Sequence, residues 1–379
     1  MIFDELPLKK YITETVNLGD GETMAEIVYD NAKAFVLELE VIGYRAEKRF
    51  DMGSTEGVFY AHPDGDNVYF YKNAGVPFAR AVIGAKLPQD DTNVGDPIYR
   101  DTVFYQAKNS PNPLGGGMTY LVRLRDGRFI VFDGGGEISP ECFFSAMKEL
   151  HPNIGEGGPF IVAAWFITHP HDDHIELLKR LMSDEILLSR LKIERFYANL
   201  PDESVLVGVD DQVIPDNNFV RAVVFEYVKA HGGKASKPYA GMSFNVGELR
   251  FEVMYTAADW FSTQRKTIND ASMIFAVSRE GGKKVLFLGD IMNRVTVPLK
   301  KMYAAGELHA DAVQVAHHAH VGPDTSFYEY ISPKMLFWPI SNDCYFLPDD
   351  DQITVRNRQL RQLDVFHCIA YLGAAQIVI

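Results

Sequence analysis

The feature that most constrains this chain is a long apolar run that leads directly into His-Pro-His-Asp-Asp-His at 169–174. The run has the length and composition of a buried strand, and imidazole and carboxylate groups are ligands of Zn²⁺ and similar cations. In an extended segment His169 and His171 point the same way, because side chains alternate along a strand. The chain then turns into a predicted helix, so Asp173 and His174 can face the same space. One short segment could therefore offer ligands to two neighbouring metal ions.

A solvated polar loop after a strand is the plainer interpretation of this segment. Three of the eleven histidines of the chain fall within these six residues, which favours the metal site.

Two later apolar runs also end in candidate ligands. Residues 285–288 run into Gly289-Asp290, and a carboxylate at a strand end can bridge two cations. A further run ends in His317-His318. One of these histidines is expected to bind metal and the other to orient substrate or support a ligand; His318 is also a candidate catalytic residue. Ordinary turns and a surface histidine run are the alternatives.

Two weaker motifs complete the candidate site. Asp270, in the sequence Asn-Asp-Ala-Ser at 269–272, could face the metals or simply begin the strand predicted to follow. Asp133 precedes three glycines after another predicted strand, and its carboxylate could hydrogen-bond a ligating histidine. A plain turn is the rival interpretation there.

In this order, the motifs resemble those of the metallo-β-lactamase-fold superfamily over about residues 115–379. The segment 169–174 looks like its signature, Asp290 like its bridging aspartate and His317-His318 like its final histidine motif. The set is most similar to the branch that includes the nuclease-like domain of bacterial DNA-uptake channel proteins. The resemblance implies a four-layer αββα sandwich with a site at one edge. That site usually holds two divalent metal ions, most often Zn, with Mn or Fe as alternatives.

The chain departs from the family pattern at one ligand. Many members carry a further histidine between the signature and the bridging aspartate, whereas here His231 is the only histidine in that interval and is predicted at a helix end. Asp270 or Asn269 could take its place. This departure leaves the filling of the first metal position open.

The resemblance implies a metal-dependent hydrolase that cleaves a phosphodiester or related ester through a metal-activated hydroxide. Asp173 would bind metal and orient the water, and His317 or His318 would help to protonate the leaving group. One alternative is a single-metal or metal-free binding module on the same fold. Another is a di-iron redox protein, which is disfavoured because those relatives carry a carboxylate where this chain has His171.

Composition limits the substrate and the setting. The 379 residues carry a net charge of −14, which argues against long nucleic acid and favours a small or short phosphoester. The three cysteines, Cys142, Cys344 and Cys368, form no close pair, so we expect no disulfide framework and a cytoplasmic location. No apolar run approaches the length of a membrane span, and no secretory signal is recognisable at the start. Self-association into a homo-oligomer stays open.

The sequence also predicts two domains. Residues 1–110 are expected to form a small α+β accessory domain, with a helix over 22–43 and strands near 57–62, 67–72 and 78–83. A turn-rich linker over 89–113 leads to the catalytic domain, 115–379, where strands and helices alternate. An antiparallel pair predicted within that domain disfavours a purely parallel, doubly wound sheet. The accessory domain is expected to shape the substrate entrance or mediate assembly.

Overall fold

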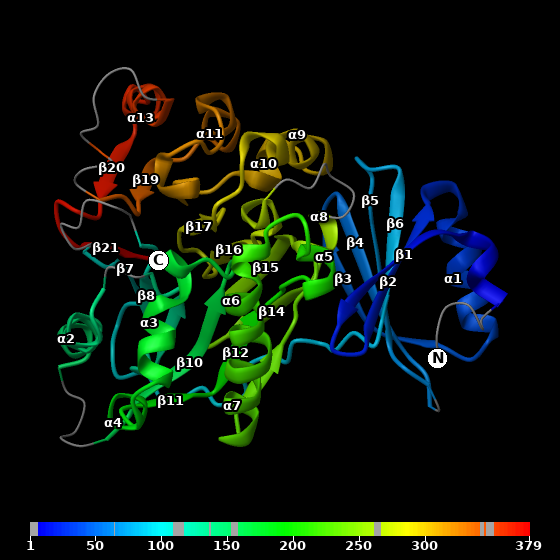
Figure 1. Ribbon diagram of the computed structural model, residues 1–379, viewed down its shortest axis with the longest axis horizontal. Helices are drawn as coiled ribbons and strands as arrows, with labels where there is room; N and C mark the ends of the chain where they lie inside the picture. Colours follow the sequence, from blue (N-terminus) through cyan, green and yellow to red (C-terminus); the bar gives the residue numbers. More distant parts are fainter. Residues whose placement is uncertain are drawn as a thin grey trace.

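The computed structural model describes residues 7–63, 65–108, 117–135, 138–152, 158–260, 267–341, 345 and 352–379. Its class is α+β: a four-layer αββα sandwich beside a smaller N-terminal α+β unit (Figure 1). The sandwich is the layered arrangement that the resemblance implies. Part of the predicted linker, 109–113, and Cys344 lie outside the described residues; Cys142 and Cys368 are free thiols.

Two mixed sheets form the inner layers of the sandwich. The first has the order β13-β12-β10-β9-β8-β7-β21, with β11 beside β10. Its strands are β7 (Val103–Gln106), β8 (Tyr120–Arg123), β9 (Phe129–Phe132), β10 (Phe160–Ile167), β11 (Leu191–Ile193), β12 (Arg195–Ala198), β13 (Lys234–Ser236) and β21 (Ala375–Val378). The second runs in sequence order through β14 (Ser243–Val246), β15 (Leu249–Tyr255), β16 (Ile274–Ser278), β17 (Lys284–Phe287), β18 (Ala312–Gln314), β19 (Met335–Trp338) and β20 (Phe366–Ile369).

Phenylalanine rings fill the space between the two sheets. Phe132 of β9 lies 4.3 Å from Phe287 of β17, and Phe166 of β10 lies 4.6 Å from Phe251 of β15, measured between ring centroids. The neighbouring Trp165 points to the opposite face of β10 and packs against Phe143. Alternation along a strand thus places one aromatic residue in the central core and the next beneath the helices.

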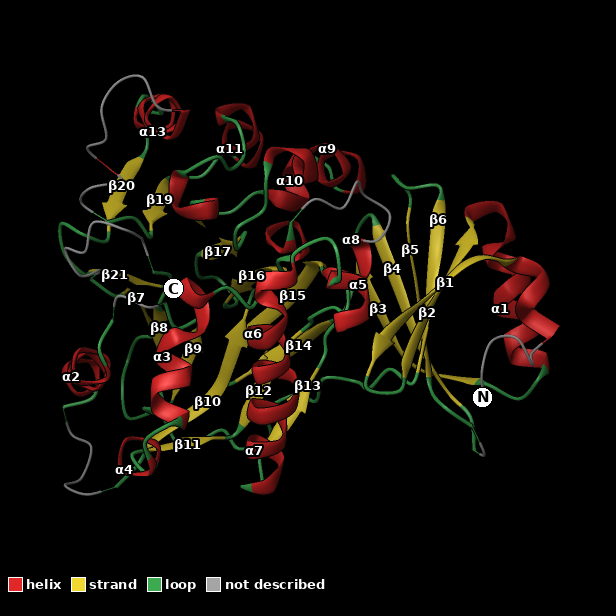
Figure 2. Ribbon diagram, in the orientation of Figure 1, coloured by secondary structure: helices red, strands yellow, loops and turns green. Residues whose placement is uncertain are grey.

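Helices cover the outer face of each sheet (Figure 2). The first sheet carries α2 (Pro140–Leu150), α3 (Asp172–Met182), α4 (Glu185–Leu188), α6 (Ile214–Asn218) and α7 (Phe225–Ala230). Beside the second sheet lie α8 (Ala257–Trp260), α9 (Asn293–Met302), α10 (Ala305–Leu308), α11 (Thr325–Ile331) and α13 (Gln352–Arg361). The short α5 (Glu203–Leu206) follows β12. Among the described helices, none combines the length and the apolar character needed to cross a bilayer.

The N-terminal unit is an antiparallel sheet with the order β1-β2-β6-β5-β4-β3. Its strands are β1 (Ile12–Gly19), β2 (Glu22–Val28), β3 (Arg45–Met52), β4 (Thr55–Ala61), β5 (Val68–Asn73) and β6 (Phe78–Ile83). One face carries α1 (Ala32–Val41), with Phe35 stacked on Phe70. The other face joins the hydrophobic core on the outer side of the second sheet.

The helix predicted over residues 22–43 is wrong in its first part. Residues 22–28 form β2, which pairs with β1 on one side and β6 on the other, and only 32–41 are helical. The apolar spacing of Met24, Ile27 and Val28 suits either structure. Hydrogen bonding to β1 and β6 makes residues 22–28 a strand rather than a helix. The division into domains at about residues 110–115 stays a prediction, although β7 already belongs to the sandwich.

Candidate metal centre

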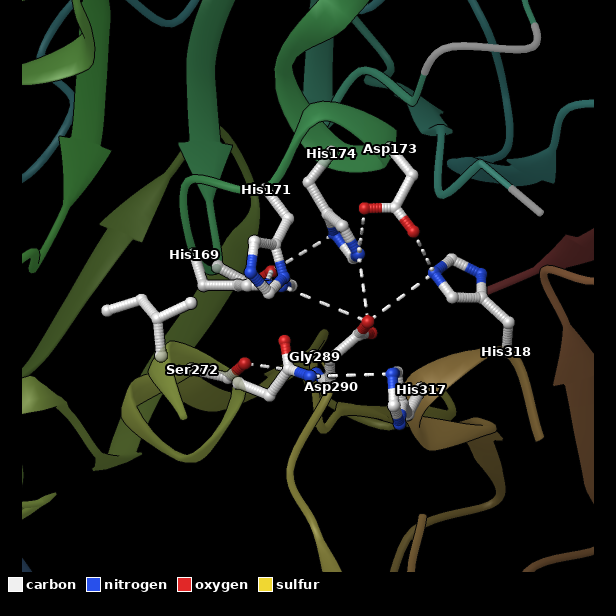
Figure 3. A network of polar contacts seen from close by, with 12 residues as sticks. His169, His171, Asp173, His174, Ser272, Gly289, Asp290, His317 and His318 are labelled. Carbon is white, nitrogen blue, oxygen red and sulfur yellow. Dashed lines mark hydrogen bonds and ion pairs between the residues drawn. The ribbon is translucent and has the colours of Figure 1, made fainter. Parts of the chain in front are cut away.

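Four side chains converge at one edge of the sandwich, each placed by the end of a regular element. Asp173 and His174 lie in the first turn of α3, which follows β10. Asp290 follows β17, and His318 follows β18. Their ligand atoms all lie within 4.8 Å of one another. Because strands of both sheets end here, residues far apart in the sequence reach one point (Figure 3).

The Asp290 carboxylate lies at the centre of this group. Its Oδ2 is 3.2 Å from Nε2 of His174 and 3.4 Å from Nε2 of His318. Nε2 of His318 is also 3.1 Å from Oδ2 of Asp173. Two imidazoles and two carboxylates around one point are a donor set suited to a divalent cation.

A second pair of histidines approaches Asp290 from the other side. Nε2 of His169 lies 3.8 Å from Oδ2 of Asp290 and 3.0 Å from Nδ1 of His171. Figure 3 shows the two rings on the side of Asp290 away from His318, with the His169 ring joined to the carboxylate. Asp290 therefore lies between two groups of donors, one with Asp173, His174 and His318 and one with His169 and His171.

The outer nitrogens of these histidines face acceptors that fix the rings. Nδ1 of His174 donates to Oδ2 of Asp133 at 2.7 Å, and Nδ1 of His318 donates to the carbonyl oxygen of Pro339 at 2.5 Å. Because Nδ1 of each ring is engaged on the outside, Nε2 is directed into the cluster. This outer hydrogen bond is typical of metal-ligating histidine.

The other two rings have weaker outer contacts. Nδ1 of His169 lies 3.2 Å from the Thr168 hydroxyl, and Nε2 of His171 lies 3.8 Å from Oδ2 of Asp210. His171 is the more exposed of the two, with 30% of its side chain accessible.

Electrostatics also mark the cluster. Burial disfavours the charged form of His174, but the carboxylates of Asp290 and Asp133 hold its pKa well above the usual range. The same balance, dominated among the favourable contributions by Asp290, raises the pKa of His318 to about 10. Burial likewise opposes ionisation of Asp290, yet the two imidazoles hold its pKa well below the usual range. The carboxylates of the cluster therefore stabilise positive charge on the groups between them.

Unpaired polar atoms test whether a cation fits this site. Nε2 of His174, Nε2 of His318 and both Asp290 oxygens are buried, and although they face one another at ion-pair distances, none has a hydrogen-bond partner within the described part of the chain. Buried polar atoms are nearly always satisfied in proteins. A bound cation would satisfy all four atoms at once, so the residues fit the metal that the motifs predict.

Unusual backbone supports these positions. Asp133, His317 and His318 all have left-handed φ angles, between 51° and 54°, which non-glycine residues seldom adopt. Gly289 has a φ of 57°, and a Cβ there would lie 2.6 Å from Cβ of Ser272. Only glycine therefore fits immediately before Asp290.

The predicted residues do not all join the cluster. His169, His171, Asp173, His174, Asp290 and His318 come together, as described above. Asp270 is buried, and its carboxylate accepts hydrogen bonds from Nε of Arg294 and from the backbone N–H of Met292 instead. The structure thus does not bring Asp270 to the place of the missing histidine.

His317 and His318, although adjacent, are placed differently. His318 lies in the four-residue group, whereas Nε2 of His317 lies 3.4 Å from Nδ2 of Asn269. His231 is exposed at the end of α7, and its Nδ1 contacts the carbonyl oxygen of Tyr227. A catalytic role for His318 or Asp173 stays a prediction.

Sequence reasoning missed three groups that orient the ligands: Thr168, Asp210 and the carbonyl of Pro339. Thr168 donates to Oδ2 of Asp133 at 2.8 Å as well as contacting His169. Its place at the end of the apolar run was the only available signal. Asp210 lies in a stretch without a motif, and a backbone carbonyl leaves no trace in the residue type.

No protein-family model and no curated protein matches this sequence. Solved structures similar to the chain include the metallo-beta-lactamase fold protein YhfI from Bacillus subtilis. That match has 12% identity and a TM-score of 0.44, and it covers 73% of this chain and 100% of that one. A diphosphatase from the PhnP family matches at 15% identity and a TM-score of 0.42, over 73% of this chain and 97% of that one. Unliganded yeast PDE1 matches at 11% identity and a TM-score of 0.42, over 74% of this chain and 100% of that one. With scores this low, the fold assignment rests on the sheets and helices of the chain itself.

Proposed function

We propose that this protein is a metal-dependent hydrolase of phosphodiesters or related esters. The observation that carries the proposal is the group Asp173, His174, Asp290 and His318, whose ligand atoms converge while buried atoms among them lack partners. Outer hydrogen bonds fix the rings of His174 and His318 with Nε2 directed inward. Such orientation is what a resident metal needs and a solvated loop does not.

We assign two metal positions that share Asp290. Asp173, His174 and His318 would complete the first, and His169 with His171 would begin the second. The second position has fewer protein donors, because the family's additional histidine is absent. Zn²⁺ is the ion that this imidazole-rich set suits best, with Mn²⁺ or Fe as alternatives. When bound, divalent cations supply an activated water molecule and stabilise charge that develops on the ester oxygens.

The residues of the chain would then do the remaining work. Asp173 has 41% of its side chain accessible, so its carboxylate can accept a hydrogen bond from the attacking water. His318 is committed to a ligand position by its bond to Pro339. We therefore assign protonation of the leaving group to His317, which adjoins His318 outside the four-residue group.

The substrate that we propose is small. A net charge of −14 works against long polyanions, whereas a short phosphoester needs only the local positive charge of the metals. The closer likeness to the DNA-uptake branch rests on motifs alone and stays a prediction.

Elemental analysis of protein purified without chelator tests the proposal, with Asp290→Ala as the variant. Asp172→Ala is the matched control, because Asp172 lies one residue from Asp173 but is 69% accessible and pairs with Lys179. We expect one to two metal atoms per chain in the wild type and the control, and far fewer in Asp290→Ala. Hydrolysis of bis(4-nitrophenyl) phosphate and of a lactone series should follow the metal content.

Other outcomes separate the alternatives. One metal per chain with no turnover would favour a single-metal binding module. A yellow, iron-loaded protein would favour the di-iron redox reading. No metal in any of the three proteins, and none taken up on reconstitution, would contradict the proposal.

A further inference from the structure

A cavity of about 420 Å³ lies between the N-terminal sheet and the helix α9. We call it the interdomain cleft. One wall is the turn between β5 and β6, residues 75–78, and the other is α9 with Arg294, Val297 and Lys301. Its volume is in the range of small-molecule binding sites. No residue proposed as a metal ligand lines it.

The two walls of the interdomain cleft are held in direct contact. Nδ2 of Asn73 donates to the carbonyl oxygen of Met302 at 2.8 Å. A Cβ at Gly75 would lie 1.6 Å from the carbonyl oxygen of Lys301, so the turn approaches the helix as closely as its backbone allows. The cleft is therefore preformed, and it exists only where both units are present.

The charges in the cleft contrast with those of the whole chain. Arg80, Arg294 and Lys301 line it against a single acid, Asp259, in a protein with a net charge of −14. Arg80 and Asp259 are buried and pair with each other at 3.0 Å, which makes them the structural base of the cavity. Arg294 and Lys301 thus remain on the α9 wall, and Arg294 already pairs through Nε with the buried Asp270. Lys301 is exposed and forms no ion pair within the residues described.

Arg294 provides a second observation that points to a ligand. Its Nε donates to Asp270, while its Nη2 is buried and has no hydrogen-bond partner in the described part of the chain. The Arg294 side chain as a whole is 30% accessible and lines the cleft, so an anionic oxygen there can pair with its guanidinium group. The rest of the lining, including Val76, Phe78 and Val297, is apolar.

We infer that the interdomain cleft binds a small organic acid: a carboxylate or phosphate group on Arg294 and Lys301, and an apolar body against the turn and α9. The cleft is linked to the metal centre, since Arg294 pairs with Asp270 and the adjacent Asn269 contacts His317. The acid could be one end of the substrate or a separate molecule. Binding itself does not depend on the proposed hydrolase function.

Calorimetric titration of metal-free protein with phenyl phosphate and with benzoate tests this inference. Removing the metals prevents the metal centre from binding the probes, and a failure here leaves the hydrolase proposal untouched. We expect saturable binding of both acids and much weaker binding of neutral benzyl alcohol. Lys301→Met should raise the Kd about fivefold, the effect of losing one exposed charge pair. Lys300→Met is the matched control, because Lys300 lies on the same helix but contacts the carbonyl oxygen of Ser326 outside the cleft.

Val297→Trp provides an independent variant, since a large ring on the 58% exposed Val297 would fill the cleft without removing a charge. It should abolish binding while circular dichroism shows an unchanged fold. Absence of binding to the wild type, equal binding of benzyl alcohol, or an unchanged Kd in both Lys301→Met and Val297→Trp would overturn the inference.

Kinetics of the metal-loaded protein distinguish the two sources of the acid. Two 4-nitrophenyl esters that differ only in a terminal carboxylate are compared in the wild type and in Lys301→Met. If the substitution raises KM for the acidic ester alone, the acid bound in the cleft is one end of the substrate. If added benzoate changes kcat for the neutral ester in a saturable way, and this change is lost in Lys301→Met, the acid bound in the cleft is a separate molecule.

Discussion

At the scale of single residues, Asp133 shows how one side chain can orient a site without entering it. Its carboxylate accepts hydrogen bonds from the backbone N–H and the hydroxyl of Thr168 and from Nδ1 of His174, all at 2.7–2.8 Å. Its φ of 54° aims the carboxylate inward. Asp133 thereby couples the end of β10 to a ligating ring.

Asp133→Asn should weaken metal binding about 10- to 100-fold, the usual effect of losing the outer partner of a ligating histidine. Asparagine tolerates the left-handed backbone, and its amide oxygen can still accept from Thr168, so the fold should persist. Competition with a chromophoric chelator measures the affinity. Asp172→Asn, on the exposed side of the same segment, is the control. Equal affinity in Asp133→Asn and the wild type would show that His174 needs no such partner.

Gly289 permits a second prediction at this scale. Gly289→Ala combines a left-handed φ with a Cβ 2.6 Å from Ser272, whereas Gly281→Ala has a similar φ of 69° and open space around it. The control should lose about 1–2 kcal/mol of unfolding free energy, and Gly289→Ala about 1–3 kcal/mol more. Urea unfolding of both variants gives the difference. Equal losses would mean that Ser272 yields easily and that Asp290 is not tightly positioned.

At the scale of elements, Asp91 fastens the segment after β6 to the far end of the sandwich. Its buried carboxylate lies 2.8 Å from Arg128, which precedes β9, and 2.8 Å from Arg195 of β12. It also accepts hydrogen bonds from the backbone N–H groups of Asn93 and Gly247. The turn-rich linker is therefore anchored at this point.

Asp91→Asn should lower the unfolding free energy by about 1.5–3 kcal/mol, because it removes one buried carboxylate while Arg128 keeps Asp126 and Glu194 and Arg195 keeps Glu194. Asp96→Asn, on the exposed part of the same segment, should change the unfolding free energy little.

Burial raises the pKa of Asp91, but Arg128 and Arg195 overcome that effect and lower the pKa. The stabilisation is therefore present above about pH 3.9, the unfolded value, and is lost as the pH falls through the folded pKa. The difference in unfolding free energy between wild type and Asp91→Asn, measured by urea unfolding, should therefore shrink as the pH is lowered. A difference that stays constant would contradict this account.

Much of the arrangement could be predicted because each ligand directly follows an apolar run. The strand before His169 and the strand before Gly289 lie where their apolar runs place them. Contacts between distant segments could not be predicted in the same way. Asp270 pairs with Arg294 and His171 approaches Asp210, and no local pattern encodes either meeting. Strand β2 was mistaken for helix for the same reason, since its partners lie outside its own sequence.

At the scale of the whole molecule, the N-terminal sheet and the sandwich share a core. Tyr69 of β5 packs near Tyr239, and its hydroxyl donates to the carbonyl oxygen of Ala240. Ser54 contacts both carboxylate oxygens of Glu307 in α10. We therefore expect the chain to unfold in a single calorimetric transition.

Gly75→Ala should disturb this docking, because the added Cβ meets the backbone of Lys301. We expect a loss of about 1–3 kcal/mol, the usual effect of overpacking, and a broadened or divided transition in scanning calorimetry. Gly306→Ala, where nothing lies within 4 Å, is the control. A wild-type melting profile in Gly75→Ala would mean that the two units are not packed so tightly.

The pairing of β7 with β21 has a consequence for how the protein is made. Gln106 meets Ala375, so roughly 270 residues must be synthesised before β7 gains its outer neighbour. At ribosomal rates this takes about 15–50 s, during which β7 is an open strand edge on a growing polypeptide. Until β21 is made, the outer edge of β7 is open to pairing with other strands.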